Sequence, residues 1–230
     1  MNTYTWIFTG LLVVDAFLYI FGLIQRIRPL EKTARGLFIP FIAGLILSIL
    51  NEYLPDSHHI IFIASLAFSA AALFMLSTLN DSKKFVKFIE AFLFMLTELF
   101  WFLLIASVYR IFNVPPVFFI LTGIVFIAGF LVICIFIKKQ ALAKYLAAII
   151  HYGISAIFCT STLVSLIFEK RVFAILFFIG SLVTVCQVVF GIFQRTRPFA
   201  INEKTEKIIV TILTISAQSL LGAGAIMMQV

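Results

Sequence analysis

Long apolar runs follow one another along almost the whole chain of 230 residues, separated only by short polar joints. A bilayer core about 30 Å thick requires roughly 20 consecutive apolar residues from each spanning helix. The runs have this length, whereas strands of a membrane barrel span only about 9–11 residues and alternate polar with apolar positions. Charged residues make up 12% of the chain, about half the share of a soluble domain. The sequence therefore predicts an all-α fold, a polytopic membrane helix bundle.

Eight transmembrane helices are predicted, and together they make residues 1–230 a single integral membrane domain. The spans are Thr5–Ile24, Gly36–Leu50, Ile60–Leu79, Phe85–Val108, Pro116–Ile137, Tyr145–Phe168, Val172–Phe193 and Ile208–Gln229. The first span does not resemble a cleavable signal peptide, because no basic residue precedes it and Asp15 lies in its middle. In a bacterial cell this predicts a protein of the cytoplasmic (inner) membrane.

The basic residues predict how the chain is oriented. Four alternate joints, with the residues just inside the spans beside them, hold 14 of the 17 Lys and Arg residues, and the other joints hold only Arg110, Lys170 and Arg171. Because basic joints stay on the cytoplasmic side, both termini are expected outside. The net charge of +7 is thus explained by membrane topology. No nucleic-acid partner is predicted, since the basic residues are spread over four joints instead of forming one face.

Two decapeptides of similar sequence lie near the two ends of the chain, "FGLIQRIRPL" at Phe21–Leu30 and "FGIFQRTRPF" at Phe190–Phe199. Each copy lies where a predicted span reaches the cytoplasmic interface. A glycine such as Gly22 permits close helix approach there, and the proline is expected to end the helix. Two interpretations stay open. The copies are similar interface anchors or a chance likeness, or they derive from an internal duplication that places Arg28 and Arg197 on two lips of a cytoplasm-facing cleft.

Polar side chains within the spans are candidates for function, because hydrocarbon penalises them. They are Asp15, Ser69, Glu90, Glu98, His151, Gln187 and Gln218. Counting 1.5 Å per residue puts four of them near the middle of a span: Asp15, Ser69, Glu98 and Gln218. The other three lie about 8–10 Å from the cytoplasmic end: Glu90, His151 and Gln187.

A carboxylate and a histidine inside one bundle form a workable acid–base pair, so Glu98, Glu90 and His151 are the catalytic candidates. Each also has a structural interpretation. His151 then only hydrogen-bonds a neighbouring helix, Glu98 is a protonated packing residue, and Glu90 reaches the interface. Asp15 and Ser69 are then packing residues. The histidine and cysteine spacings give no metal motif, and no cofactor is indicated.

Five local patterns, taken in order along the spans, resemble those of the YhhN family of lysoplasmalogenase-type membrane proteins. They are "RPL" (Arg28–Leu30), "SAAAL" (Ser69–Leu73), "FMLTELFW" (Phe94–Trp101), "CQ" (Cys186–Gln187) and "TISAQ" (Thr214–Gln218). The likeness covers nearly the whole chain and rests more on spacing than on identity. Glu98 and Trp101 stand where the family pattern has histidine and tyrosine, and both aspartates of that pattern are absent.

The resemblance implies an eight-span fold and hydrolysis of the vinyl-ether bond of lysoplasmalogens, with membrane lipids and a lysophospholipid as partners. On this chain Glu98 is the expected acid, and Glu90 or His151 the base. The expected substrate-binding residues are Asp15, Ser69, Gln187, Gln218, Arg28 and Arg197. Two alternatives stay open: a catalytically silent relative that binds lipid, and a small proton-coupled transporter that uses the same ionisable groups as a relay.

Overall fold

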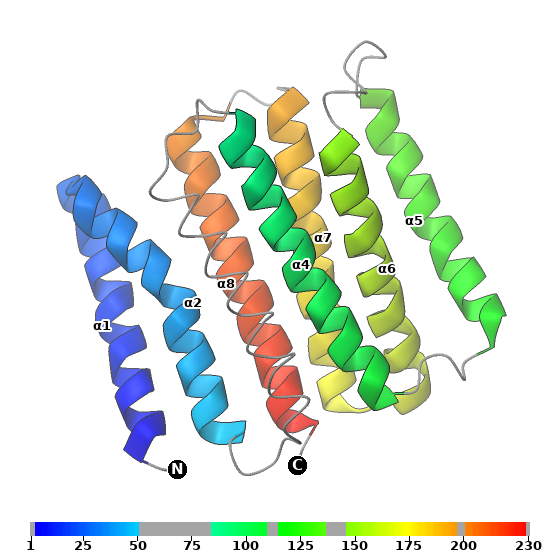
Figure 1. Ribbon diagram of the computed structural model, residues 1–230, viewed down its shortest axis with the longest axis horizontal. Helices are drawn as coiled ribbons and strands as arrows, with labels where there is room; N and C mark the ends of the chain where they lie inside the picture. The colour runs from blue at the N-terminus through cyan, green and yellow to red at the C-terminus, as the bar shows by residue number, and fades with distance from the viewer. Residues whose placement is uncertain (1–2, 51–83, 110–114, 137–145, 197–200, 229–230) are drawn as a thin grey trace.

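The computed structural model describes residues 3–50, 84–109, 115–136, 146–196 and 201–228 (Figure 1). All regular secondary structure in these ranges is α-helical. The helices are α1 (Thr3–Gln25), α2 (Arg28–Leu50), α4 (Lys84–Tyr109), α5 (Pro116–Phe136), α6 (Leu146–Glu169), α7 (Val172–Thr196) and α8 (Glu203–Met227). The predicted span Ile60–Leu79, with Ser69, lies outside the described residues.

The helices stand side by side and run up and down in one bundle (Figure 1). Helix α1 packs on α2, α2 on α8, α8 on α7, α7 on α6, and α6 on both α4 and α5. The bundle therefore has α1 at one edge and α5 at the other. Helix α1 begins and α8 ends at the same end of the bundle, which agrees with termini on one side of a membrane.

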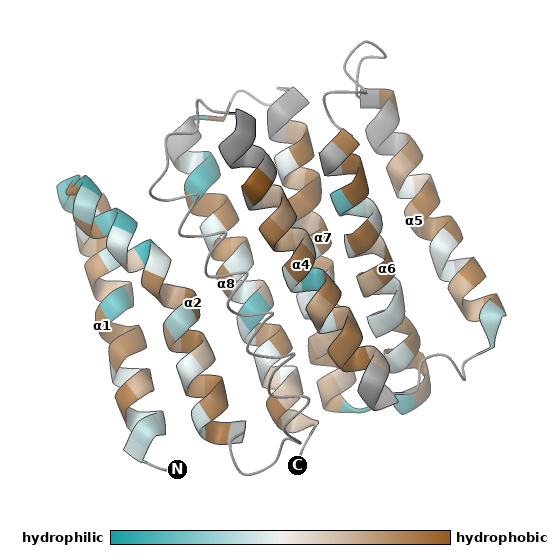
Figure 2. Ribbon diagram, viewed as in Figure 1, coloured by the Kyte–Doolittle hydropathy of each residue, from teal (hydrophilic) through white to brown (hydrophobic). Residues whose placement is uncertain are grey.

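Five of the described helices are long and apolar enough to cross a bilayer. These stretches are Thr3–Gln25, Arg28–Ile49, Ile149–Glu169, Val172–Phe193 and Thr205–Met227. Hydrophobic residues, coloured brown in Figure 2, predominate along the helices. The apolar stretches within α4 and α5 are shorter. The prediction of an all-helical integral membrane protein is confirmed, while the count of eight spans and the side on which the termini lie stay predictions.

The turn between α1 and α2 explains why α2 begins earlier than predicted. Arg26 adopts the left-handed backbone conformation, with φ of 58°, and the Ile27 N–H donates to the Gly22 carbonyl at 3.0 Å, which is a Schellman-type helix end. Pro29 then lies in the first turn of α2, where a missing N–H costs nothing. The expected start at Gly36 was therefore eight residues late, because the proline begins a helix here.

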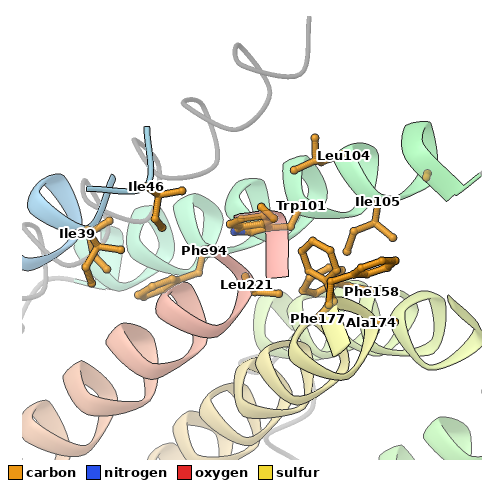
Figure 3. Packing of buried hydrophobic residues seen from close by; sticks show 14 of the residues in the cluster. Ile39, Ile46, Phe94, Trp101, Leu104, Ile105, Phe158, Ala174, Phe177 and Leu221 are labelled. Carbon is orange, nitrogen blue, oxygen red and sulfur yellow. The ribbon is translucent and has the colours of Figure 1, made fainter. Parts of the chain in front are cut away.

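The apolar core gathers around α4 (Figure 3). Trp101 is fully buried there and packs with Leu104 and Ile105 of its own helix. Side chains from four other helices complete this cluster, among them Ile39, Ile46, Phe158, Phe177 and Leu221. The edge of the Phe177 ring meets the Trp101 ring, with centroids 6.2 Å apart. This packing fixes the rotation of α4 about its axis, and so determines where Glu98, one turn before Trp101, points.

Candidate functional site: a buried carboxylate–histidine–serine cluster

Two of the predicted catalytic residues meet between α4 and α6. Glu98 Oε1 lies 2.9 Å from His151 Nε2, and Ser155 Oγ donates to Glu98 Oε2 at 2.6 Å. All three side chains are buried, with exposed fractions of 2%, 7% and 0% in that order. We call these three residues the Glu98 cluster. It is the hypothesised acid–base pair with one additional hydroxyl.

Helix periodicity accounts for the arrangement. His151 and Ser155 are four residues apart, so they occupy one face of α6, and Glu98 faces them from α4. Phe94, one turn before Glu98, stacks on the His151 ring with the two planes 11° apart. Ser155 Oγ also lies 3.0 Å from the His151 carbonyl oxygen. The imidazole is therefore held by an aromatic ring on one face and by the carboxyl at its edge.

The cluster can hold a proton at two alternative places. Each carboxyl oxygen of Glu98 has its own partner, which offsets part of the cost of burying charge. With a proton on Nε2 the imidazole donates to Glu98, and with that proton on Glu98 the carboxyl donates to the imidazole. The Ser155 hydroxyl bonds the carboxylate and the His151 carbonyl, not a histidine nitrogen, so it lacks the base that activates a serine nucleophile. The geometry suits general acid–base chemistry.

The remaining candidates divide by location. Gln218 of α8 accepts a hydrogen bond from Trp101 Nε1 at 2.9 Å, one turn along α4 from Glu98. Gln187 is buried on α7, and none of the hydrogen bonds found among the described residues joins it to the cluster. Glu90 belongs to α4, two turns before Glu98, and its side chain lies outside the description. Pairing of His151 with Glu98 was not expected from their estimated depths.

Asp15 and Arg28 are not brought to the cluster. Asp15 is buried on α1, at the opposite edge of the bundle from α6, and its Oδ2 has no hydrogen-bond partner among the described residues. Arg28 is exposed at the start of α2, and Arg197 lies outside the described ranges, as does Ser69. Arg28 thus lies at one end of the bundle, and the two-lipped cleft stays a prediction.

Sequence reasoning missed Ser155 and one further buried ionisable group, Arg35. The Arg35 side chain is only 2% exposed; it bonds Glu31 at 2.8 Å and lies over the Tyr19 ring, 5.9 Å from its centroid. It was counted among the basic residues of a joint because α2 was expected to begin after it. The four-residue spacing from His151 was the available signal for Ser155.

An apolar groove lies among α4, α5 and α6, and its α6 wall extends past the level of His151 and Ser155. Its volume is about 740 Å³, which is within the usual range for ligand pockets. Its walls include Phe102, Phe126, Phe130, Tyr152, Gly153 and Ala156. Among the described residues, no group of three or more His, Cys, Asp or Glu side chains is placed to hold a metal ion.

No protein-family model, curated protein or solved structure matches this chain.

Proposed function

We propose that the chain is a YhhN-like membrane hydrolase that cleaves the vinyl-ether bond of lysoplasmalogens, with Glu98 and His151 as its acid–base pair. The observation that carries the proposal is the 2.9 Å contact between these two buried groups. Intramembrane ionisable residues are costly and generally mark functional sites. The sequence resemblance supplies the reaction class, and the cluster supplies groups able to perform it.

The proposed reaction needs one proton to move twice. The Glu98–His151 pair first delivers its proton to the enol-ether carbon, which produces an oxocarbenium ion that the remaining negative charge stabilises. Water then adds to this cation and returns a proton to the pair. The hemiacetal collapses to an aldehyde and the glycerophospho-base, so the net change is addition of one water molecule. Glu90 is the alternative base, two turns away on α4.

The other predicted binding groups are assigned outer roles in the proposal. Gln187 and Gln218 orient water or the polar part of the substrate, and Arg28, exposed at the end of the bundle, attracts the phosphate. Asp15 is far from the cluster on α1, so a direct role at the scissile bond is left out. The proton-coupled transporter, with Asp15, Glu90, Glu98 and His151 as its relay, stays the alternative.

Aldehyde release from a lysoplasmalogen by the purified protein in lipid nanodiscs tests the proposal. We expect release by the unchanged chain and a loss of about 100-fold in Glu98→Gln, the usual contribution of a general acid. Glu169→Gln, which changes an exposed carboxylate at the far end of α6, is the matched control and should retain activity. No aldehyde from any headgroup form would reject hydrolysis and favour a silent lipid-binding relative. Full activity in Glu98→Gln would reject the assigned pair.

A further inference from the structure

We infer that the groove among α4, α5 and α6 binds the single hydrocarbon chain of a lysophospholipid. It would hold that chain with the headgroup-proximal bonds level with Glu98. The inference deepens the proposed function. It depends on that function only for the identity of the bond that is cleaved. Binding of the chain is a separate statement that holds for a single-chain lipid whether or not it is hydrolysed.

The groove and the Glu98 cluster share two helices. Tyr152 and Ala156 of the groove wall follow His151 and Ser155 directly in α6, and Phe102 of the wall follows Glu98 by one turn in α4. Successive residues of a helix project about 100° apart, so the groove and the cluster occupy different faces of α6 at the same level along the helix. The shared level of the groove and of the buried Glu98–His151 pair along α6 is the first argument for a substrate chain.

The dimensions of the groove fit one chain of one leaflet. Its α6 wall runs from Ile149 to Ser161, roughly 18 Å at 1.5 Å per residue. One leaflet of the hydrocarbon core is about 15 Å thick, half of the bilayer core. His151 and Ser155 do not line the groove, but they fall within the first half of this stretch of α6, toward the end of the bundle where α6 begins. That end is the predicted cytoplasmic one, so the headgroup would stay at the interface while the tail extends inward.

The lining of the groove is almost entirely apolar. Phenylalanines from α4 and α5 form the sides. The Tyr152 hydroxyl donates to the Phe126 carbonyl at 3.0 Å, and the Ser161 hydroxyl donates to the Ile157 carbonyl at 2.9 Å. Because these two hydroxyls already donate hydrogen bonds within the protein, a polar ligand would gain few hydrogen bonds from them. A hydrocarbon chain needs no hydrogen bonds and can be buried there without leaving a polar group unpaired.

Two glycines keep the groove open. A methyl group added at Gly123 of α5 or at Gly153 of α6 would meet no atom within 4 Å, and both residues line the groove. Larger side chains at these places would therefore occupy the space without displacing protein atoms. Gly10 of α1 offers equal freedom at the opposite edge of the bundle, and so provides a matched control.

Photolabelling with a long-chain lysophosphatidylcholine that carries a diazirine near the end of its chain tests the inference. The experiment uses the full chain in nanodiscs, and mass spectrometry locates the labelled residues. We expect labels on the groove segments of α5 and α6, reduced about tenfold in Gly123→Leu and Gly153→Leu and unchanged in Gly10→Leu. Excess unlabelled long-chain lysolipid should compete, whereas glycerophosphocholine, which has no chain, should not.

The same labelling in Glu98→Gln separates the two proposals. If the unchanged chain releases no aldehyde from any headgroup form while groove labelling persists in it and in Glu98→Gln, chain binding is supported and hydrolysis is rejected. Aldehyde release with labels spread evenly over the lipid-facing helices, or insensitive to Gly123→Leu and Gly153→Leu, overturns the groove and leaves hydrolysis standing. Labelling that is lost because a second copy of the chain covers the groove, seen as a dimer crosslinked through α5, also overturns it.

Discussion

At the scale of single residues, the Glu98–His151 pair should be strongly coupled. Removing one member of a buried pair leaves an uncompensated group and costs about 3–5 kcal/mol, whereas replacing both with apolar residues costs far less. We therefore expect His151→Leu and Glu98→Leu each to destabilise the protein more than the double variant does. A double-mutant cycle of unfolding free energies in detergent measures the coupling. Simple additivity of the two single changes would contradict the 2.9 Å contact.

Ser155 should influence Glu98 more than its small size suggests. Its hydroxyl donates to Oε2 at 2.6 Å, so Ser155→Ala leaves a buried carboxylate oxygen without a partner and should cost about 1–3 kcal/mol. Ser165→Ala is the matched control, because the buried Ser165 hydroxyl donates only to the Ser161 carbonyl of its own helix. Thermal unfolding of both variants gives the comparison. Equal shifts in Tm would mean that the Ser155–Glu98 bond contributes nothing specific.

Residue types predicted the members of the cluster better than they predicted its geometry. Glu98 and His151 were identifiable because an ionisable group within a long apolar run is costly in hydrocarbon and generally marks a functional site. Their contact was not, because depth was counted along each span from its own expected end, and neighbouring helices begin at different levels. Ser155 was overlooked because a serine in a helix can hydrogen-bond its own backbone, so its residue type alone does not indicate a role in a site.

At the scale of elements, the α1–α2 hairpin should depend on Gly22. A methyl group there would lie 2.8 Å from the Glu31 backbone nitrogen, and backbone cannot move aside as a flexible side chain can. Gly22→Ala should thus lower stability by about 1–3 kcal/mol, the typical cost of overpacking. Gly10→Ala, on the same helix with open space around it, should leave Tm unchanged or raise it slightly through helix propensity. A stable Gly22→Ala variant would contradict this hairpin geometry.

Helix positions were largely predictable, and the misses have one physical cause. Apolar length alone located α5 and α7, whose starts at Pro116 and Val172 agree with the expected spans. Helices α2 and α8 begin eight and five residues earlier than expected because polar first turns, at Arg28 and Glu203, extend beyond the apolar stretch. A hydropathy pattern locates the hydrocarbon part of a helix, whereas hydrogen bonding and capping decide where the helix begins.

At the scale of the whole molecule, two polar centres lie near opposite edges of one apolar bundle. Arg35 and Glu31 interact at the α1–α2 side, and the Glu98 cluster lies between α4 and α6. Composition could predict the membrane setting, because hydrocarbon requires nearly every lipid-facing position to be apolar. It could not predict two separate centres, since the order in which helices pack is determined by side-chain fit and not by average hydropathy.

The arrangement of the helices and the orientation of the bundle in the membrane can be tested in one experiment. The α1–α2 turn, with exposed Arg28, and the α6–α7 turn, with exposed Arg171, lie at opposite ends of the bundle (Figure 1). In a variant whose three cysteines are replaced, we expect Arg171→Cys to react with a membrane-impermeant maleimide on intact cells. Arg28→Cys should react only after permeabilisation, because basic joints stay inside. The reverse result would overturn the predicted orientation alone, whereas labelling of both positions from one side would contradict the arrangement of the helices itself.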